Sequence, residues 1–168
     1  MYLFDLYILS ELCCMILLQV PRSLYQLVHL QYLNLRSNQI SFLDDDLGKL
    51  TSLVHLDLGC NMLDEIPVTI GNLKMLTILR VDELCITELP ETVADLNSLE
   101  LLDVSNSKKL ESLPTQSLSK LPRMWKVYVF KCDKLLKANN FGSLSRFICK
   151  NSPSFFSKHK GPLNYQFT

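Results

Sequence analysis

Apolar residues return along this chain at a fixed interval of 23 positions. The interval is marked by Leu27, Leu50, Leu73 and Leu96. Three stretches repeat one apolar template, reading LQYLNLRSNQI from Leu30, LVHLDLGCNML from Leu53 and LTILRVDELCI from Leu76. Such a period is typical of an array of stacked structural units, and not of a globule with one irregular core.

The spacing inside the template predicts one short strand in each unit. The second and third leucines of L-x-x-L-x-L are two residues apart, so in an extended strand both point to one side, while the residues between and beside them point to the other. One unit cannot bury these leucines by itself, and stacking places equivalent strands in one parallel sheet. We therefore predict an α/β solenoid with a curved parallel sheet on its concave face and short 3₁₀, helical or extended segments on its convex face.

The second half of a unit carries an apolar residue followed by proline, as in Ile66-Pro67, Leu89-Pro90 and Leu113-Pro114. Proline has a fixed φ and no N–H, which suits a short 3₁₀ turn or an extended run better than a long helix. Two units after Leu96 match the template less closely, and a unit at the start of the chain has lost part of it. Together with the three clear units, we expect about six units. The predicted organisation is a degenerate first repeat at 1–26, repeats at 27–143, and a C-terminal tail at 144–168 that is partly capping and partly disordered.

Asn38 and Asn61 stand where the chain leaves the predicted strand. A buried amide there can bond to backbone groups of its own turn and of the next one, groups that would otherwise cost about 1–3 kcal/mol each. Leu84 occupies this position in the third unit, so we expect its turn either to use other partners or to remain loose. Ser107 and Cys132 occupy it in the two units that follow.

Composition fits a folded domain, with 168 residues, 48% hydrophobic and 20% charged. The 17 basic and 17 acidic residues cancel, so no overall field favours nucleic acid or anionic lipid, although the basic residues gather toward the C-terminus. The apolar stretch 3–20 is interrupted by Asp5 and Glu11 and is not expected to span a membrane. The oligomeric state stays open.

Six cysteines lack the paired spacing of a disulfide framework, and the chain has no Asn-x-Ser/Thr acceptor. Both features favour reduced thiols and a cytoplasmic protein.

Candidate catalytic groups are scattered along the chain. His55 and Cys60 are close in sequence but have no evident third group to orient them. The run at 44–46 offers three carboxylates without the alternating ligands, glycine and distal glutamate of a calcium loop, and is read as a solvated convex turn. We therefore expect no enzyme activity, no metal and no cofactor.

The residues that flank the strand leucines form the predicted binding face, which would take a protein partner. Its candidate partner-binding residues are Tyr32, Asn34, Arg36, His55, Asp57, Ile78, Arg80, Asp82, Leu101, Asp103, Lys126, Tyr128 and Phe130. Charges of both signs alternate among them, which is typical either of cross-strand pairing or of partner recognition.

The units from about Val20 to Asp95, above all the stretch ILRVDELCITELP, resemble the intracellular leucine-rich repeats of the Ras-suppressor group and of the Scribble and Erbin polarity scaffolds, with Leu84 in place of the usual Asn. The later stretches SNSKKLESLP and VFKCDKL are more similar to repeats of plant-type intracellular immune receptors. This resemblance, over roughly 70% of the chain, implies a non-catalytic module whose partner is a protein, such as a small GTPase or another signalling protein. Two functions remain open: a cytoplasmic signalling scaffold, or the ligand-sensing segment of a larger intracellular immune receptor or ubiquitin ligase.

Overall fold

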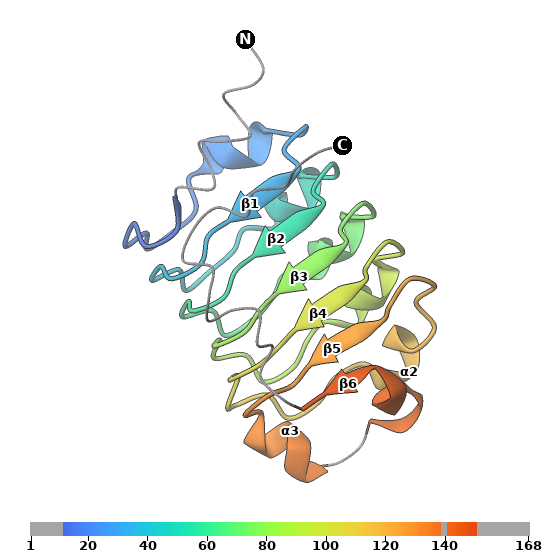
Figure 1. The fold of residues 1–168 in the computed structure, drawn as a ribbon. Coiled ribbons are helices and arrows are strands. Elements are labelled where there is room, and N and C mark those ends of the chain that lie inside the picture. The colour runs from blue at the N-terminus through green and yellow to red at the C-terminus, as the bar shows by residue number, and fades with distance from the viewer. Residues whose placement is uncertain (1–11, 139–140, 151–168) are drawn as a thin grey trace, which may run out of the picture.

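The computed structural model of the chain describes residues 12–138 and 141–150, which form one stack of parallel strands (Figure 1). The strands lie side by side in chain order: β1 (Tyr32–Asn34), β2 (His55–Asp57), β3 (Ile78–Arg80), β4 (Leu101–Asp103), β5 (Lys126–Tyr128) and β6 (Ile148–Cys149). The predicted solenoid of about six units is thereby confirmed. Residues 1–11 of the first repeat and 151–168 of the tail lie outside the described residues.

Register between the strands places equivalent leucines directly beside one another. Leu33 pairs with Leu56, Leu56 with Leu79, and Leu79 with Leu102. All four side chains are 0% exposed. Burying one leucine completely contributes about 1.5–3 kcal/mol, so each added unit extends a ladder that stabilises the units on both sides.

Short helices cover the opposite side of the sheet, behind the strands in Figure 1. Four 3₁₀ helices come first: η2 (Arg22–Gln26), η3 (Asp45–Lys49), η4 (Val68–Asn72) and η5 (Glu91–Asp95). The longer unit after Leu96 forms α2 (Thr115–Leu118) instead, and α3 (Asp133–Ala138) and η6 (Gly142–Phe147) follow. No helix in the described parts of the chain is long and apolar enough to cross a membrane.

The residues just before these helices explain where they begin. Pro67 and Pro90 precede η4 and η5 with φ of −63°, the value that the proline ring imposes. Asp44 precedes η3 in place of proline, and its side chain accepts a hydrogen bond from Asp46 N at 3.0 Å. Asp46 in turn pairs with Lys49 at 2.8 Å. The acidic run at 44–46 therefore caps a helix on the convex side.

The segment 141–149 adds a sixth strand, which the apolar pattern did not indicate. Phe141 and Leu144 are buried against the last unit. Ile148 and Cys149 then pair with Val127 and Tyr128 of β5. This segment therefore covers the C-terminal leucines and also lengthens the concave face by one strand.

A ladder of polar side chains satisfies the turns that follow the strands. Asn61 Oδ1 accepts a hydrogen bond from Ile40 N at 3.1 Å. Asn61 Nδ2 donates to the carbonyl oxygens of Leu35 and Leu58 at 2.9 and 2.8 Å. Asn38 repeats the arrangement one unit earlier, where it accepts from Leu17 N at 3.0 Å. The amides thus link each turn to its neighbour.

Leu84 interrupts this ladder, and the next unit supplies the missing partner. Ser107 Oγ accepts from Leu84 N and donates to Val81 O, both at 3.3 Å. Cys132 continues the ladder, because its thiol donates to Val104 O at 3.0 Å. Of the two alternatives for the Leu84 turn, other partners or a loose turn, the structure shows the first.

We predict that Asn61→Leu, which copies the residue found one unit later, lowers the free energy of unfolding by about 2–4 kcal/mol, because Ile40 N and Leu58 O lose their amide partner and Leu35 O keeps only its bond from Asn38. Urea denaturation followed by circular dichroism measures the change. Asn97→Leu, at an exposed Asn, is the control and should change stability by less than about 0.5 kcal/mol. Equal losses in the two variants would contradict the ladder's role.

Candidate functional site

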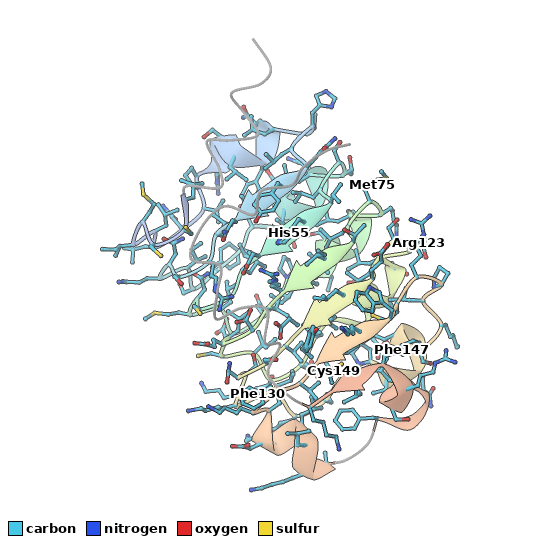
Figure 2. All side chains as sticks on the ribbon, in the orientation of Figure 1. His55, Met75, Arg123, Phe130, Phe147 and Cys149 are labelled. Carbon is cyan, nitrogen blue, oxygen red and sulfur yellow. The ribbon has the colours of Figure 1, made fainter. Side chains whose placement is uncertain are left out.

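The sheet register brings the candidate residues together on one face. Its first column holds Tyr32, His55, Ile78, Leu101 and Lys126, and its second holds Asn34, Asp57, Arg80, Asp103 and Tyr128. A third column continues beyond the strands, since Ser37 N bonds to Gly59 O at 3.0 Å and Cys60 N to Asp82 O at 2.9 Å. Figure 2 shows His55 near the N-terminal strands of this face, with Phe130 and Cys149 near its C-terminal end.

An ion-pair network occupies the N-terminal half of the face. The Arg36 guanidinium donates to both carboxylate oxygens of Asp82 at 2.8 and 2.7 Å and lies 3.4 Å from Asp57. Arg80 reaches the other oxygen of Asp57 at 3.3 Å. Burial alone would lower the pKa of Arg36, but the hydrogen bonds to Asp82 and the charge of Asp57 raise it above its ordinary value. The network therefore stays charged and internally paired.

Gly59 allows Arg36 to contact Asp82, which is the partner farthest from it along the chain. Arg36 follows β1, whereas Asp82 follows β3, so the guanidinium must pass over the strand between them. A Cβ at Gly59 would overlap the guanidinium and lie 2.6 Å from Asp82 Oδ1. The missing side chain therefore leaves the space through which Arg36 reaches its partner.

Three residues of the second column shape the backbone rather than face solvent. Asn34, Asp57 and Asp103 each accept a hydrogen bond from the backbone N–H two residues ahead, at 3.0 Å in every case. These side-chain turns end the strands and begin the turns that carry the polar ladder. Asp57 and Asp103 are 2% and 3% exposed, so little of either carboxylate can meet a partner.

His55 is also buried on this face, 4% exposed, with its ring centroid 4.5 Å from that of Tyr32. Neither ring nitrogen has a hydrogen-bond partner among the described residues. Burial, and then the charge of Arg80, lower the pKa of His55 to about 3. The ring is therefore neutral and packs as an aromatic group.

The geometry gives no support to a His55–Cys60 dyad. The unbonded ring nitrogens of His55 do not orient a nucleophile, and Cys60 Sγ accepts a hydrogen bond from Arg36 at 3.0 Å. Burial raises the pKa of the Cys60 thiol to about 11, so it stays protonated. Cys60, Asp82 and Glu83 have ligand atoms within 4.8 Å of one another, but Arg36 already bonds to two of the three. We assign no metal to this group.

The C-terminal half of the face is more accessible. Ile78, Leu101, Tyr128 and Phe130 are partly exposed, and Lys126 lies among them. The Lys126 ammonium is 5.8 Å from the Tyr128 ring, and that of Lys131 is 5.2 Å from the Phe130 ring. These apolar and aromatic surfaces are the types most often found as anchors of protein interfaces.

Sequence reasoning missed Trp125, Phe147 and Cys149 at this end of the face. Trp125 precedes β5 and is 53% exposed. Cys149 pairs with Tyr128, which is 21 positions earlier and not 23, so the fixed interval did not reveal it. The three consecutive apolar residues from Phe147 to Cys149 were the available signal, but no leucine template accompanies them.

We predict that Gly59→Ala destabilises the fold by about 1–3 kcal/mol, because the new Cβ displaces Arg36 and leaves buried Asp82 with fewer partners. Chemical denaturation measures the loss. The same substitution in an Arg36→Ala background should cost clearly less, since no guanidinium remains to be displaced. Equal costs in the two backgrounds would show that Gly59 is needed for another reason.

Asp103 and His55 are both buried, and their contributions to the free energy of unfolding change in opposite directions with pH. Burial, and then the charge of Asp82, raise the pKa of Asp103 to about 6, so its protonation favours the folded state as the pH falls. His55 has a lowered pKa and therefore favours the unfolded state as the pH falls below about 6.5. Between about pH 6 and pH 4 the two contributions cancel.

We therefore predict that Asp103→Asn, relative to the unchanged protein, loses stability by on the order of 1 kcal/mol per pH unit between about pH 6 and pH 4, because His55 is no longer offset. His55→Phe should gain stability over the same range. Asn34 already makes the equivalent backbone bond, so the turn survives Asp103→Asn. Urea unfolding across this pH range tests both, and parallel curves for all three proteins would refute the assignment.

Comparison with known proteins places this geometry in a family. The model of the leucine-rich repeat region matches residues 13–150. Among solved structures, a leucine-rich repeat protein of Leptospira interrogans is 27% identical, with a TM-score of 0.54 over 76% of this chain and 40% of that one. The chain thus spans less than half the length of that protein.

Two further solved structures are similar to this chain. The ectodomain of the receptor kinase GASSHO1/SCHENGEN3 from Arabidopsis thaliana, in complex with CASPARIAN STRIP INTEGRITY FACTOR 2, is 33% identical over 66% of this chain and 14% of that one, with a TM-score of 0.56. The PEPR1–AtPEP1 structure is 29% identical over 67% and 16%, with a TM-score of 0.58. Curated protein sequences give no significant match. By its repeats, its sheet and the match over most of its length, the chain belongs to the leucine-rich repeat family.

Proposed function

We propose that this chain is a non-catalytic interaction module that binds a protein partner on the C-terminal half of its concave face. The observation that carries the proposal is the run of partly exposed apolar and aromatic side chains at Ile78, Leu101, Tyr128 and Phe130, held in register on neighbouring strands. The ion-pair network of the N-terminal half is consistent with this placement. Its charges are paired with one another, and its Asn34 and Asp57 side chains also bond to the backbone.

The dimensions suit a peptide or one side of a small domain. The four strands β3 to β6 that carry this half, at about 4.8 Å spacing, extend over roughly 14 Å. Aromatic side chains bury large areas with few rotatable bonds, so they are effective centres of an interface. The receptor-kinase ectodomain of GASSHO1/SCHENGEN3 was solved as a complex, and similarity to it supports a binding role for this chain.

The finer role that we favour is a cytoplasmic signalling scaffold. Cys132 supports a reducing location, because its thiol donates a hydrogen bond within the polar ladder and only the reduced form can do so. The similarity to intracellular scaffold repeats around ILRVDELCITELP points the same way.

The second candidate is the sensing segment of a larger receptor or ligase. It is favoured by the solved relatives, of which this chain covers 40% or less. Sequencing of full-length transcripts separates the two candidates: an adjoining ATPase domain supports the receptor, and a PDZ or GTPase-linked region supports the scaffold.

To test the binding face, a photo-crosslinking residue at position 101 would first capture and identify a partner. We then expect the double variant Leu101→Ser with Tyr128→Ala to weaken that partner's affinity by about 100-fold, since two anchors are lost, while the melting temperature stays nearly constant. The matched control is Val68→Ser with Met75→Ser, which removes two apolar side chains that are 62% and 57% exposed away from the concave face. Loss of binding in the control alone would place the interface elsewhere.

A further inference from the structure

Aromatic and basic side chains alternate at the end of the concave face where β5 and β6 begin. The group, called here the aromatic–basic patch, consists of Trp125, Lys126, Tyr128, Arg146 and Phe147. The Lys126 ammonium lies 4.5 Å from the Trp125 ring centroid, and the Arg146 guanidinium lies 4.5 Å from that of Phe147. Trp125 is 53% exposed, an unusual exposure for so large an apolar side chain.

The backbone places these residues beside one another. Val127 of β5 pairs with Ile148 of β6, so Lys126 and Phe147, each one residue earlier, lie where these two neighbouring strands begin. Trp125 and Arg146 precede them by one more residue in each chain segment. Figure 2 shows Phe147 near the start of these last strands and Cys149 further along β6. The patch therefore continues the surface that carries Tyr128.

The charge of this end differs from that of the remaining described chain. Residues 121–150 contain seven basic residues and one acid, Asp133, whereas residues 12–120 contain 14 acids and eight bases. Within the described residues, Lys126 and Arg146 form no ion pair; Arg146 donates to Ser119 O at 3.4 Å. Lys126 beside the exposed Trp125 ring and Arg146 beside the partly buried Phe147 ring thus remain available to a negatively charged group.

We propose that the aromatic–basic patch binds an acidic segment of a protein partner, with carboxylates at Lys126 and Arg146 and an apolar side chain against Trp125 and Phe147. The inference rests on the proposed binding function and specifies the partner's chemistry. Charge complementarity supports the cationic contacts, and Trp125, with the accessible part of Phe147, supplies the apolar part of the interface.

Acidic neighbours limit the length of anion that the patch can hold. Glu100 borders it just before β4, and its carbonyl oxygen accepts hydrogen bonds from Trp125 N and Lys126 N. The positive surface therefore spans two strands, on the order of 10 Å, which fits a few carboxylates. A nucleic acid strand or an anionic membrane would extend over the preceding strands, where Arg36 and Arg80 are already paired with carboxylates and would attract it little.

Trp125 is the sole tryptophan of the chain, so its emission reports on the patch directly. The probe is a short synthetic peptide in which Asp and Glu flank one Phe. We expect a blue shift of the emission on titration, an affinity that falls about tenfold or more as salt rises from low to physiological strength, and little response to the same peptide with Asn and Gln.

Lys126→Glu should weaken binding of the acidic peptide by at least about tenfold, and Lys126→Glu with Arg146→Glu should abolish it. Arg22→Glu makes the same charge change at a side chain that is 90% exposed at the other end of the stack, and should leave the affinity unchanged. Circular dichroism confirms folding, and the single Lys126→Glu variant decides the result if the double variant unfolds.

Equal binding of the neutral peptide, or no change in Trp125 emission, would overturn the inference. Tighter competition by single-stranded RNA or by vesicles of anionic lipid would overturn it as well. If the acidic peptide fails while Leu101→Ser with Tyr128→Ala still loses the captured partner, the concave-face function stands and only its acidic specificity is wrong. If both tests fail, both proposals fall.

Discussion

Lateral packing of equivalent leucines is the constraint on which the whole structure depends. Leu33, Leu56, Leu79 and Leu102 are fully buried and adjacent because each repeat returns the chain to the same register. A shift of one residue would turn the leucines outward and reverse the face on which the variable residues lie. The leucine ladder therefore determines both the core and the composition of the concave surface.

Polar groups on that surface divide into two kinds because of their surroundings. Near the N-terminal strands, Arg36 and Arg80 offset Asp57 and Asp82, and the second-column carboxylates also bond to the backbone. Near the C-terminal strands, aromatic rings and lysines replace this network. The alternation of charge seen in the sequence is thus mainly internal pairing, while the surface suited to a partner is largely apolar and basic.

Most of the fold followed from the sequence, because strands, core ladder and convex turns all repeat with the 23-residue period. The columns of the candidate face followed for the same reason. The burial of individual residues within a column could not be predicted from the sequence, because the exposure of Asp103 or His55 depends on neighbours contributed by other units. The strand at Ile148–Cys149 was also missed, since it lies at a 21-residue spacing and lacks the leucine template.

The contact between Arg36 and Asp82 links repeats that are not nearest neighbours in the stack. Most interactions in a solenoid join nearest neighbours, so that end units can fray independently of the centre. Arg36 joins the unit of β1 to that of β3, 46 residues away, across the gap at Gly59. Opening the unit of β1 therefore also removes a partner from the unit of β3, so this contact couples units beyond nearest neighbours.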